Sequence, residues 1–198
     1  MSDNWKLDTD DAGIAWLCID KAEAKANVLS SHVIEELNTI LDGLEANPPA
    51  GLVMYSGKPG SFIMGADINE FGDFGSPADV VRLTKMAQGV FLRIRHLPCP
   101  TVVAVNGVCL GGGLELATAT HVRVADPTVT FQLPEGRRGI FVGGGASVRV
   151  GRILGPDRMT EMMLTGRKYN ADEGLALGLT HYSVGSGEAL PLARELAA

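Results

Sequence analysis

The sequence is organised around three consecutive glycines, Gly111-Gly112-Gly113, which follow an apolar segment and precede an amphipathic one. Glycine loses the most backbone freedom on folding, so such a run is unfavourable inside a strand or a helix. It is expected where backbone N–H groups approach a ligand closely, often at the start of a helix. There the helix dipole and the unpaired amides favour negative charge. The run therefore predicts a strand, a tight turn and a helix start that can hold an anion.

A carboxylate follows this run at once, because Glu115 comes two residues after Gly113. A backbone that holds an anion beside a carboxylate is the outline of a catalytic site. The other interpretation is a tight turn followed by a solvated glutamate that interacts favourably with the helix dipole. This stretch alone leaves both interpretations open.

Apolar runs and helical spacings alternate along the chain, which predicts an α/β fold. We expect strands at 5–8, 13–19, 51–56, 101–105, 122–125, 128–131 and 181–184. We expect helices at 30–46, 78–97, 113–120, 143–154, 157–164 and 171–177, and a last helix at 188–198 whose apolar face is barely begun. Residues 61–69 are expected to be a loop, and 71–77 an irregular and mobile segment. The helix at 78–97 is expected to turn inward Val80, Val81, Leu83, Met86, Val90, Ile94 and Leu97.

Composition narrows the class of protein. Hydrophobic residues make up 45% and charged residues 20%, as in an ordinary soluble globular protein, and no linker interrupts the chain, so we expect a single domain over 1–198. A net charge of -6 without a Lys/Arg run argues against a nucleic-acid partner. No apolar stretch approaches the ~18 residues of a membrane span, and the polar, acidic start predicts neither a secretory nor a mitochondrial presequence.

The cysteines indicate a reducing compartment. Cys18, Cys99 and Cys109 lie in apolar surroundings and lack the spacing of metal ligands. We therefore expect reduced thiols in the core, no metal site and a cytoplasmic location.

Three motifs, taken together, identify a family. They are Ser61-Phe62-x-x-Gly65-Ala66-Asp67-Ile68, then Ala104-Val105-Asn106-Gly107-x-x-x-Gly111-Gly112-Gly113-x-Glu115-Leu116, then Pro134-Glu135 followed by Gly143-Gly144-Gly145. Their order and spacing resemble the crotonase superfamily, also called the enoyl-CoA hydratase/isomerase family, from about Trp5 to the end of the chain. Each motif alone is a weak signal, but the combination is quite specific. The resemblance implies a spiral of repeated ββα units, packed as a homotrimer or a dimer of trimers, that binds acyl-CoA thioesters.

The resemblance also implies a site. The thioester carbonyl would lie between the backbone N–H groups of Ala66 and Gly112, an oxyanion hole that stabilises an enolate. Glu115 and Glu135 match the two acids of the hydratase branch, which add water reversibly and with syn geometry to a trans-2-enoyl-CoA. Which acid holds which proton stays open. No cofactor is implied, since coenzyme A is part of the substrate. The positions expected along the substrate and its CoA are Lys25, Ala26, Gly65, Ala66, Asp67, Ile68, Asn69, Gly111 and Gly112.

Other interpretations remain beside this one. Enoyl-CoA isomerases rely on one acid, near the position of Glu135, so isomerisation is an alternative. Lys25 could equally be a solvated lysine, and Asp67 is expected to shape its turn and cap the next segment. Relatives usually continue beyond the position where this chain stops, with helices that help to close the acyl-CoA site. The sequence is therefore expected to be either truncated in its C-terminal helical region or a shortened variant, which could bind CoA or a partner without turnover.

Overall fold

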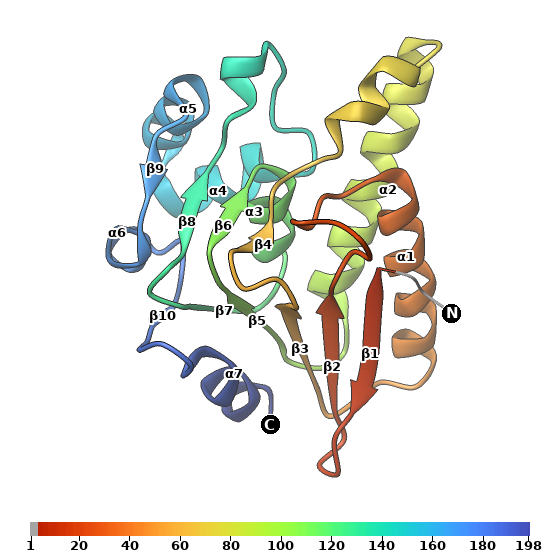
Figure 1. Ribbon diagram of the computed structural model, residues 1–198, viewed down its shortest axis with the longest axis vertical. Helices are drawn as coiled ribbons and strands as arrows, with labels where there is room; N and C mark the ends of the chain where they lie inside the picture. Colours follow the sequence, from red (N-terminus) through yellow and green to blue (C-terminus); the bar gives the residue numbers. More distant parts are fainter. Residues whose placement is uncertain (1–3) are drawn as a thin grey trace.

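The main sheet of this computed structural model, which describes residues 4–198, has six strands in the order β1-β2-β3-β5-β7-β10. They are β1 (Trp5–Thr9), β2 (Ile14–Ile19), β3 (Gly51–Ser56), β5 (Thr101–Val105), β7 (Val122–Ala125) and β10 (Tyr182–Ser183). β1 and β2 form an antiparallel pair, and the remaining neighbours are parallel. The predicted α/β class is confirmed (Figure 1).

A second, four-stranded sheet contains β4 (Ser61–Ile63), β6 (Val108–Leu110), β8 (Thr130–Gln132) and β9 (Lys168–Tyr169). Each of β4, β6 and β8 follows directly after a strand of the main sheet, so the chain alternates between the two sheets and then enters a helix. This alternation is the ββα repeat that the resemblance implied, and it confirms the spiral.

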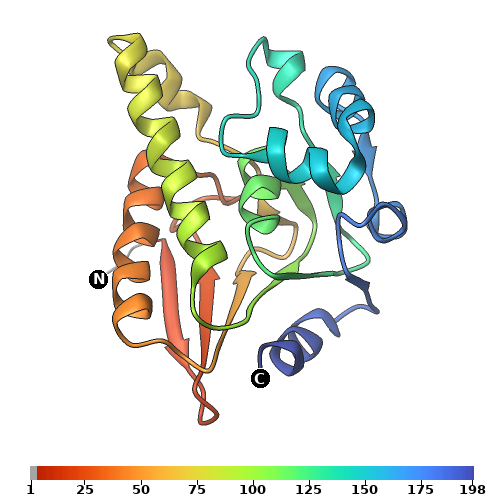
Figure 2. The ribbon, with the colours of Figure 1, turned by 180° about the vertical axis from the view of Figure 1, so that it is seen from behind.

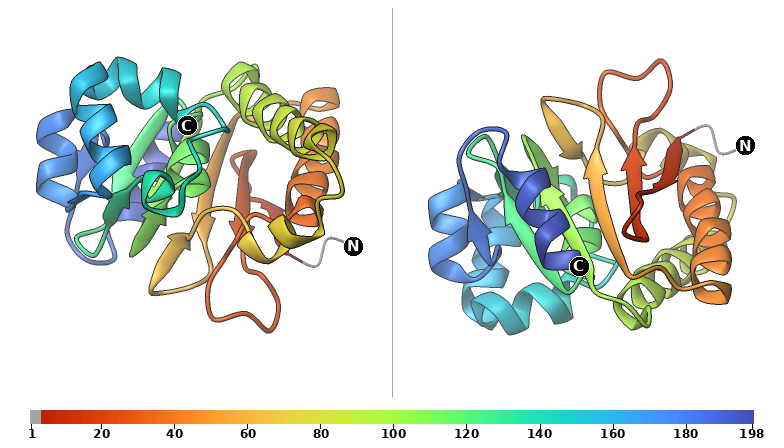
Figure 3. Two further views of the ribbon diagram at one scale, coloured as in Figure 1. Left: turned by 90° about the horizontal axis from the view of Figure 1, so that it is seen from above. Right: turned by 90° about the horizontal axis from the view of Figure 1, so that it is seen from below.

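Helices cover both faces of the main sheet. The helices are α1 (Ser31–Ala46), α2 (Pro77–His96), α3 (Gly112–Ala117), α4 (Ala146–Leu154), α5 (Pro156–Thr165), α6 (Ala171–Leu177) and α7 (Ala189–Ala197), with 3₁₀ turns η1 (Ile68–Asp73) and η2 (Glu135–Arg138). α1 and α2 lie side by side over one face (Figure 2). α7 packs against β3, β5 and β7 on the opposite face (Figure 3).

β2 is buried on both of its faces. Its residues Leu17 and Ile19 are fully buried in the larger core with α1 and α2, whereas Ile14 belongs to the smaller core with α7. A strand between two helical layers therefore has no polar face, which is why β2 reads as a continuous apolar run.

Several expectations were wrong, each for a local reason. The loop predicted at 61–69 contains β4 and the start of η1, and β6 was not predicted at all; three-residue strands are too short to show a period. The helix predicted at 157–164 begins one residue earlier, at Pro156, with Gly155 at the position before it. The last helix has a working apolar face, because Ala189, Ala193 and Ala197 are buried.

The inner face expected for α2 was also wrong in part. Val80 and Val81 are 45% and 51% exposed, because the N-terminal half of α2 projects beyond the sheet (Figure 1). Val90 and Ile94, nearer the C-terminal end of the helix, are buried as expected. The segment expected to be irregular at 71–77 is partly regular, since η1 extends to Asp73 and α2 begins at Pro77.

Three features of the structure concern the cysteines, membrane-spanning helices and metal sites. The three cysteines are buried and free. Within residues 4–198, no helix is long and apolar enough to cross a membrane. The same part of the chain holds no group of three or more His, Cys, Asp or Glu side chains that could bind a metal ion.

Candidate active site

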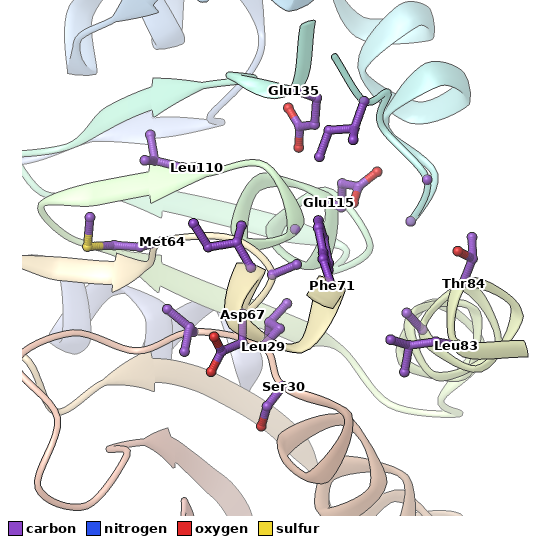
Figure 4. A pocket seen from close by; sticks show the side chains of 18 of the residues that line it. Leu29, Ser30, Met64, Asp67, Phe71, Leu83, Thr84, Leu110, Glu115 and Glu135 are labelled. Atoms are coloured by element: carbon purple, nitrogen blue, oxygen red, sulfur yellow. The ribbon is translucent and has the colours of Figure 1, made fainter. Parts of the chain in front are cut away.

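A cavity of about 1410 Å³ opens between the ends of the second sheet, α2 and the two 3₁₀ turns (Figure 4). The predicted site residues that line it are Ala66, Asp67, Ile68, Asn69, Gly112, Glu115 and Glu135. Gly65 and Gly111 lie directly behind this lining, beside Gly112 and Glu135 respectively. Lys25 and Ala26 do not line the cavity, and their part in binding CoA stays a prediction.

Two backbone amides meet at the cavity wall. Leu29 forms a parallel bridge with Ala66, in which the Leu29 amide donates to the Gly65 carbonyl at 2.8 Å and the Asp67 amide donates to the Leu29 carbonyl at 3.0 Å. The Ala66 amide therefore points away from Leu29. Gly112 begins α3, so its amide has no helical acceptor. A Cβ on Gly112 would lie 3.6 Å from the Ala66 nitrogen, and neither amide donates to an acceptor in the described residues.

Each glycine of the central run is required for a different reason. A Cβ on Gly111, whose φ is +46°, would meet Oε1 of Glu135 at 2.4 Å. A Cβ on Gly113 would meet the carbonyl oxygen of Ile63 at 2.3 Å. Gly112 presents its amide to the cavity. The run thus makes room for a carboxylate, offers a donor and lets α3 pack on β4.

Glu115 lies in the first turn of α3 and is only 5% exposed. Its Oε1 accepts a hydrogen bond of 3.0 Å from the Ala146 amide at the start of α4. Burial raises the pKa of Glu115, and the backbone donors of Ala146, Gly144 and Gly145 together with the Arg149 charge oppose that rise. A Cβ on Gly144 would lie 2.5 Å from Oε2, so the turn before α4 fits closely around this carboxylate.

Glu135 begins η2 directly after Pro134 and is 9% exposed. Its Oε2 is buried without a hydrogen-bond partner among the described residues. The pKa of Glu135 is raised to about 7, chiefly by burial and in part by the nearby charge of Glu115. A buried acid that titrates near neutrality and has a free oxygen can both give and take a proton at a ligand.

The structure adds two residues that the sequence analysis did not single out. Arg149 donates from Nη2 to the carbonyl of Glu115 at 3.1 Å and to the carbonyl of Gly144 at 2.7 Å, which ties α3 to the glycine turn. Lys21 lines the cavity and lies 3.4 Å from Oδ2 of Asp67. Neither residue stands in a motif, so no sequence signal distinguished them from other basic residues.

Asp67 has the role expected of it. Its side chain accepts from the Asn69 amide at 3.2 Å and caps η1. It also pairs with Lys21, so it holds the loop that carries the Ala66 amide. The carboxylate therefore shapes the site without facing the two acids.

The chain is similar in sequence to a known family and to curated proteins. The family model described as enoyl-CoA hydratase/isomerase matches residues 9–198. A fatty acid oxidation complex subunit alpha from Idiomarina loihiensis is 39% identical over 176 residues, which cover 87% of this chain and 25% of that relative. The chain thus spans about a quarter of the length of the curated relatives that it matches.

Solved structures extend the likeness to the whole fold. The enoyl-CoA hydratase from Bacillus anthracis has a TM-score of 0.90 at 28% identity, covering 98% of this chain and 75% of that one. The enoyl-CoA hydratase from Thermoplasma volcanium has a TM-score of 0.90 at 25% identity, covering 99% of this chain and 78% of that one.

Proposed function

The chain belongs to the enoyl-CoA hydratase/isomerase family, and from this premise we propose that it is a hydratase. It would add water reversibly, with syn geometry, to a trans-2-enoyl-CoA thioester. One observation carries the proposal: two buried acids, Glu115 and Glu135, and two unpaired amides, those of Ala66 and Gly112, line one cavity. Two proton-handling groups beside an anion-binding pair are what hydration through an enolate needs.

The amides of Ala66 and Gly112 would receive the thioester oxygen. Negative charge develops on this oxygen when water adds to C3, and fixed N–H donors stabilise it without reorganising. Removing one such donor typically slows a reaction by a factor of ~10²–10³. Asp67 and Leu29 support this pair, because both hold the segment of Ala66 in place.

The two acids would divide the proton transfers. Glu115 accepts the proton of the attacking water. Burial raises its pKa, which makes the carboxylate a stronger base, and the hydrogen bond from the Ala146 amide holds it in place. Glu135 donates its proton to C2, since its pKa of about 7 leaves a large share of the acid protonated at neutral pH. The C3–O bond forms first, as the π electrons of the C2=C3 bond move toward the thioester oxygen and give the enolate. The C2–H bond forms when the enolate collapses and takes the proton of Glu135; Glu115 then releases its proton to solvent, and Glu135 takes one up. Figure 4 places Glu115 and Glu135 near each other in the cavity, and two acids that face the same side of the double bond would give syn addition.

The remaining parts of the proposal concern binding and assembly. Lys21 and Lys168 line the cavity and can face the phosphates of coenzyme A, which is part of the substrate. The reaction needs no metal and no redox cofactor. We also expect a homotrimer or a dimer of trimers, which sedimentation of the purified protein would measure.

The test is hydration of crotonyl-CoA, followed by loss of the ultraviolet absorbance of the conjugated thioester. Glu115→Gln and Glu135→Gln should each lower turnover by at least ~10², as loss of a general acid or base does, while acyl-CoA binding stays nearly intact. Glu195→Gln, which changes an exposed acid on α7, is the matched control and should leave turnover unchanged. Unchanged turnover in either site variant would refute the two-acid mechanism.

A second candidate is enoyl-CoA isomerisation. It needs one acid that carries a proton between two carbons, and the free Oε2 of Glu135 meets that need without Glu115. Strong turnover of a 3-enoyl-CoA that does not depend on Glu115 would favour the isomerase. Clean CoA binding without turnover of either substrate would favour a binding protein.

A further inference from the structure

Arg149 of α4 sends its guanidinium back toward the start of its own helix. Its Nη2 donates to the carbonyl of Gly144 at 2.7 Å and to the carbonyl of Glu115 at 3.1 Å. The guanidinium lies against Gly145, where a Cβ would come within 2.6 Å of both Nη1 and Nη2. Arg149 does not line the cavity, so any part that it has in the reaction is indirect.

The hydrogen bonds around Arg149 form a closed ring with the side chain of Glu115. The Ala146 amide donates to Oε1 of Glu115, and the main-chain carbonyl of Glu115 accepts from Arg149. Two residues before Ala146, the carbonyl of Gly144 accepts from the same Nη2. One nitrogen therefore joins the backbone that carries the acid to the turn that receives its carboxylate. The carboxylate can leave its place only if one of these three hydrogen bonds breaks.

The place of this cation is costly for the fold. Arg149 is half-buried, and its Nε is buried without a hydrogen-bond partner among the described residues. Burial lowers the pKa of Arg149, which means that the surroundings disfavour the charge. The guanidinium also lies at the start of α4, which is the positive end of the helix dipole. A residue that served stability alone would not combine an unpaired donor with an unfavourable field.

The compensating interactions come from α3 and its acid. The Glu115 carbonyl is one of the last four of α3, which lack partners within the helix and lie at its negative end. Burial raises the pKa of Glu115 and lowers that of Arg149, and the charge of each group opposes the shift of the other. Arg149 therefore interacts with Glu115 twice, through its backbone and through the charge of its carboxylate.

Few other titratable groups face this pair in the described part of the chain. Burial, and in addition the charge of Glu115, raises the pKa of Glu135 on η2. The charge of Arg95 on α2 lowers the pKa of Arg149 further, after the effect of burial. β4 and β6 also pack against α3, and their one titratable side chain is the Cys109 thiol, whose pKa burial raises.

We propose that Arg149 is a positioning residue for the hydration: it holds the glycine turn against α3 and so fixes the carboxylate of Glu115 in the cavity. Its charge also favours the ionised carboxylate, which is the form that accepts a proton from water. Because its hydrogen bonds go to main-chain carbonyls, Arg149 supplies this charge without occupying a carboxylate oxygen. This inference rests on the proposed function, since it concerns how the base of that reaction is held.

The first experiment compares kcat and KM for crotonyl-CoA in variants of Arg149. Arg149→Met removes the charge and the donors, so kcat should fall ~10- to 100-fold while KM changes less than about threefold. Arg149→Lys keeps the charge and a donor but not the planar fork, and should recover at least ~3-fold of the lost kcat. Arg152→Met, on an exposed part of α4, is the matched control and should leave both constants unchanged. A kcat of Arg149→Met within about threefold of the unaltered protein would overturn the proposal.

The pH dependence of kcat separates this role from a merely structural one. The acid limb of the profile reports Glu115 and Glu135 as one coupled pair. Loss of the Arg149 charge raises the pKa of Glu115, so the limb of Arg149→Met should move up by ~1 pH unit, and that of Arg149→Lys by less than ~0.3. Should Arg149→Met not fold, Arg149→Gln, which keeps a donor and loses the charge, carries the same expectation. A lowered kcat with an unmoved limb would overturn the proposal.

A combination with Glu115→Gln tests whether Arg149 acts through that acid. When the base is already absent, Arg149→Met has no carboxylate left to position, so it should change the residual kcat by less than about threefold. Equal fold-losses in the two backgrounds would show that Arg149 acts through another group, and would overturn the proposal.

Urea unfolding of the same variants gives a result that does not need turnover. Arg149→Met should lower the urea midpoint more in the unaltered chain than in the Glu115→Gln background, because only the carboxylate attracts the guanidinium charge. Equal shifts in the two backgrounds would overturn the hold of Arg149 on Glu115. By contrast, no hydration of any 2-enoyl-CoA by the unaltered protein refutes the proposed function, and the urea midpoints then decide the inference alone.

Discussion

Gly144 is the position at which one added methyl group tests how the site is held together. A Cβ at this position would lie 2.5 Å from Oε2 of Glu115 and 3.0 Å from Cε2 of Phe91. Real Cβ atoms essentially never approach another heavy atom to within 3.0 Å, so Gly144→Ala must push the carboxylate away by at least 0.5 Å. The backbone at Gly144 is not in the left-handed region, so the effect is one of space alone.

The size of the expected effect follows from this displacement. A misplacement of about 1 Å at a catalytic group can cost ~10²-fold in rate, so a shift of about half that size or more should lower kcat by ~10- to 100-fold. Overpacking of a buried site should also cost ~1–3 kcal/mol of unfolding free energy, and the protein should still fold. The loss of activity should therefore far exceed any loss of folded protein.

The assay is hydration of an enoyl-CoA by Gly144→Ala, with the melting temperature measured beside it. Gly151→Ala is the control, because a Cβ at Gly151 in α4 meets no atom within 4 Å. That control should keep full activity and gain up to ~1 kcal/mol from helix propensity. A kcat of Gly144→Ala within about threefold of the unaltered protein would refute the argument that this turn positions the Glu115 carboxylate.

Two further predictions concern stability. Because burial raises the pKa of Glu135 to about 7, the unfolded chain releases a proton above pH ~4.5 that the folded chain keeps, so stability falls between those values. Glu135→Gln should therefore raise the unfolding free energy by ~2–3 kcal/mol at pH 8 and change it little at pH 4. Urea titrations of both proteins at pH 4 and pH 8 measure this difference, and an equal change at the two pH values would contradict the reasoning. Arg93 of α2 bonds to Glu45 and Asp42 of α1, so Arg93→Met should cost ~1 kcal/mol in low salt and less in 1 M NaCl; equal losses at both concentrations would contradict an ionic origin.

The sequence was sufficient for the parts of the molecule that depend on local pattern. β2, β3, β5 and α1 are long enough for their apolar patterns to show, and the helix predicted at 30–46 is α1, which Ser30 caps. Most of the second sheet was missed, because β4 and β6 have three residues each and β9 has two, and their existence depends on pairing between segments distant in the chain. Only β8 overlaps a predicted strand, the one expected at 128–131.

Periodicity also predicts an apolar face without saying what covers it. Val80 fits the helical spacing of Leu83 and Val90, yet it faces the cavity and solvent, because its end of α2 extends past the sheet. The sequence likewise could not show that Lys21, and not Lys25, lines the cavity. Both lysines stand in one loop, and only the course of the backbone decides that Lys21 reaches the cavity and Asp67.

The relation between the two acids was the least accessible to sequence, because each is accommodated by a glycine next to the other. Gly111, in the run before Glu115, leaves room for the Glu135 carboxylate. Gly144, in the run after Glu135, leaves room for the Glu115 carboxylate. Both glycine runs and both acids could be identified from their motifs. That each run packs against the acid of the other motif could be seen only in the folded chain. A side chain added at Gly111 would therefore displace the Glu135 carboxylate, and one added at Gly144 would displace the Glu115 carboxylate. The two motifs thus depend on each other sterically, in addition to the interaction between the charges of their acids.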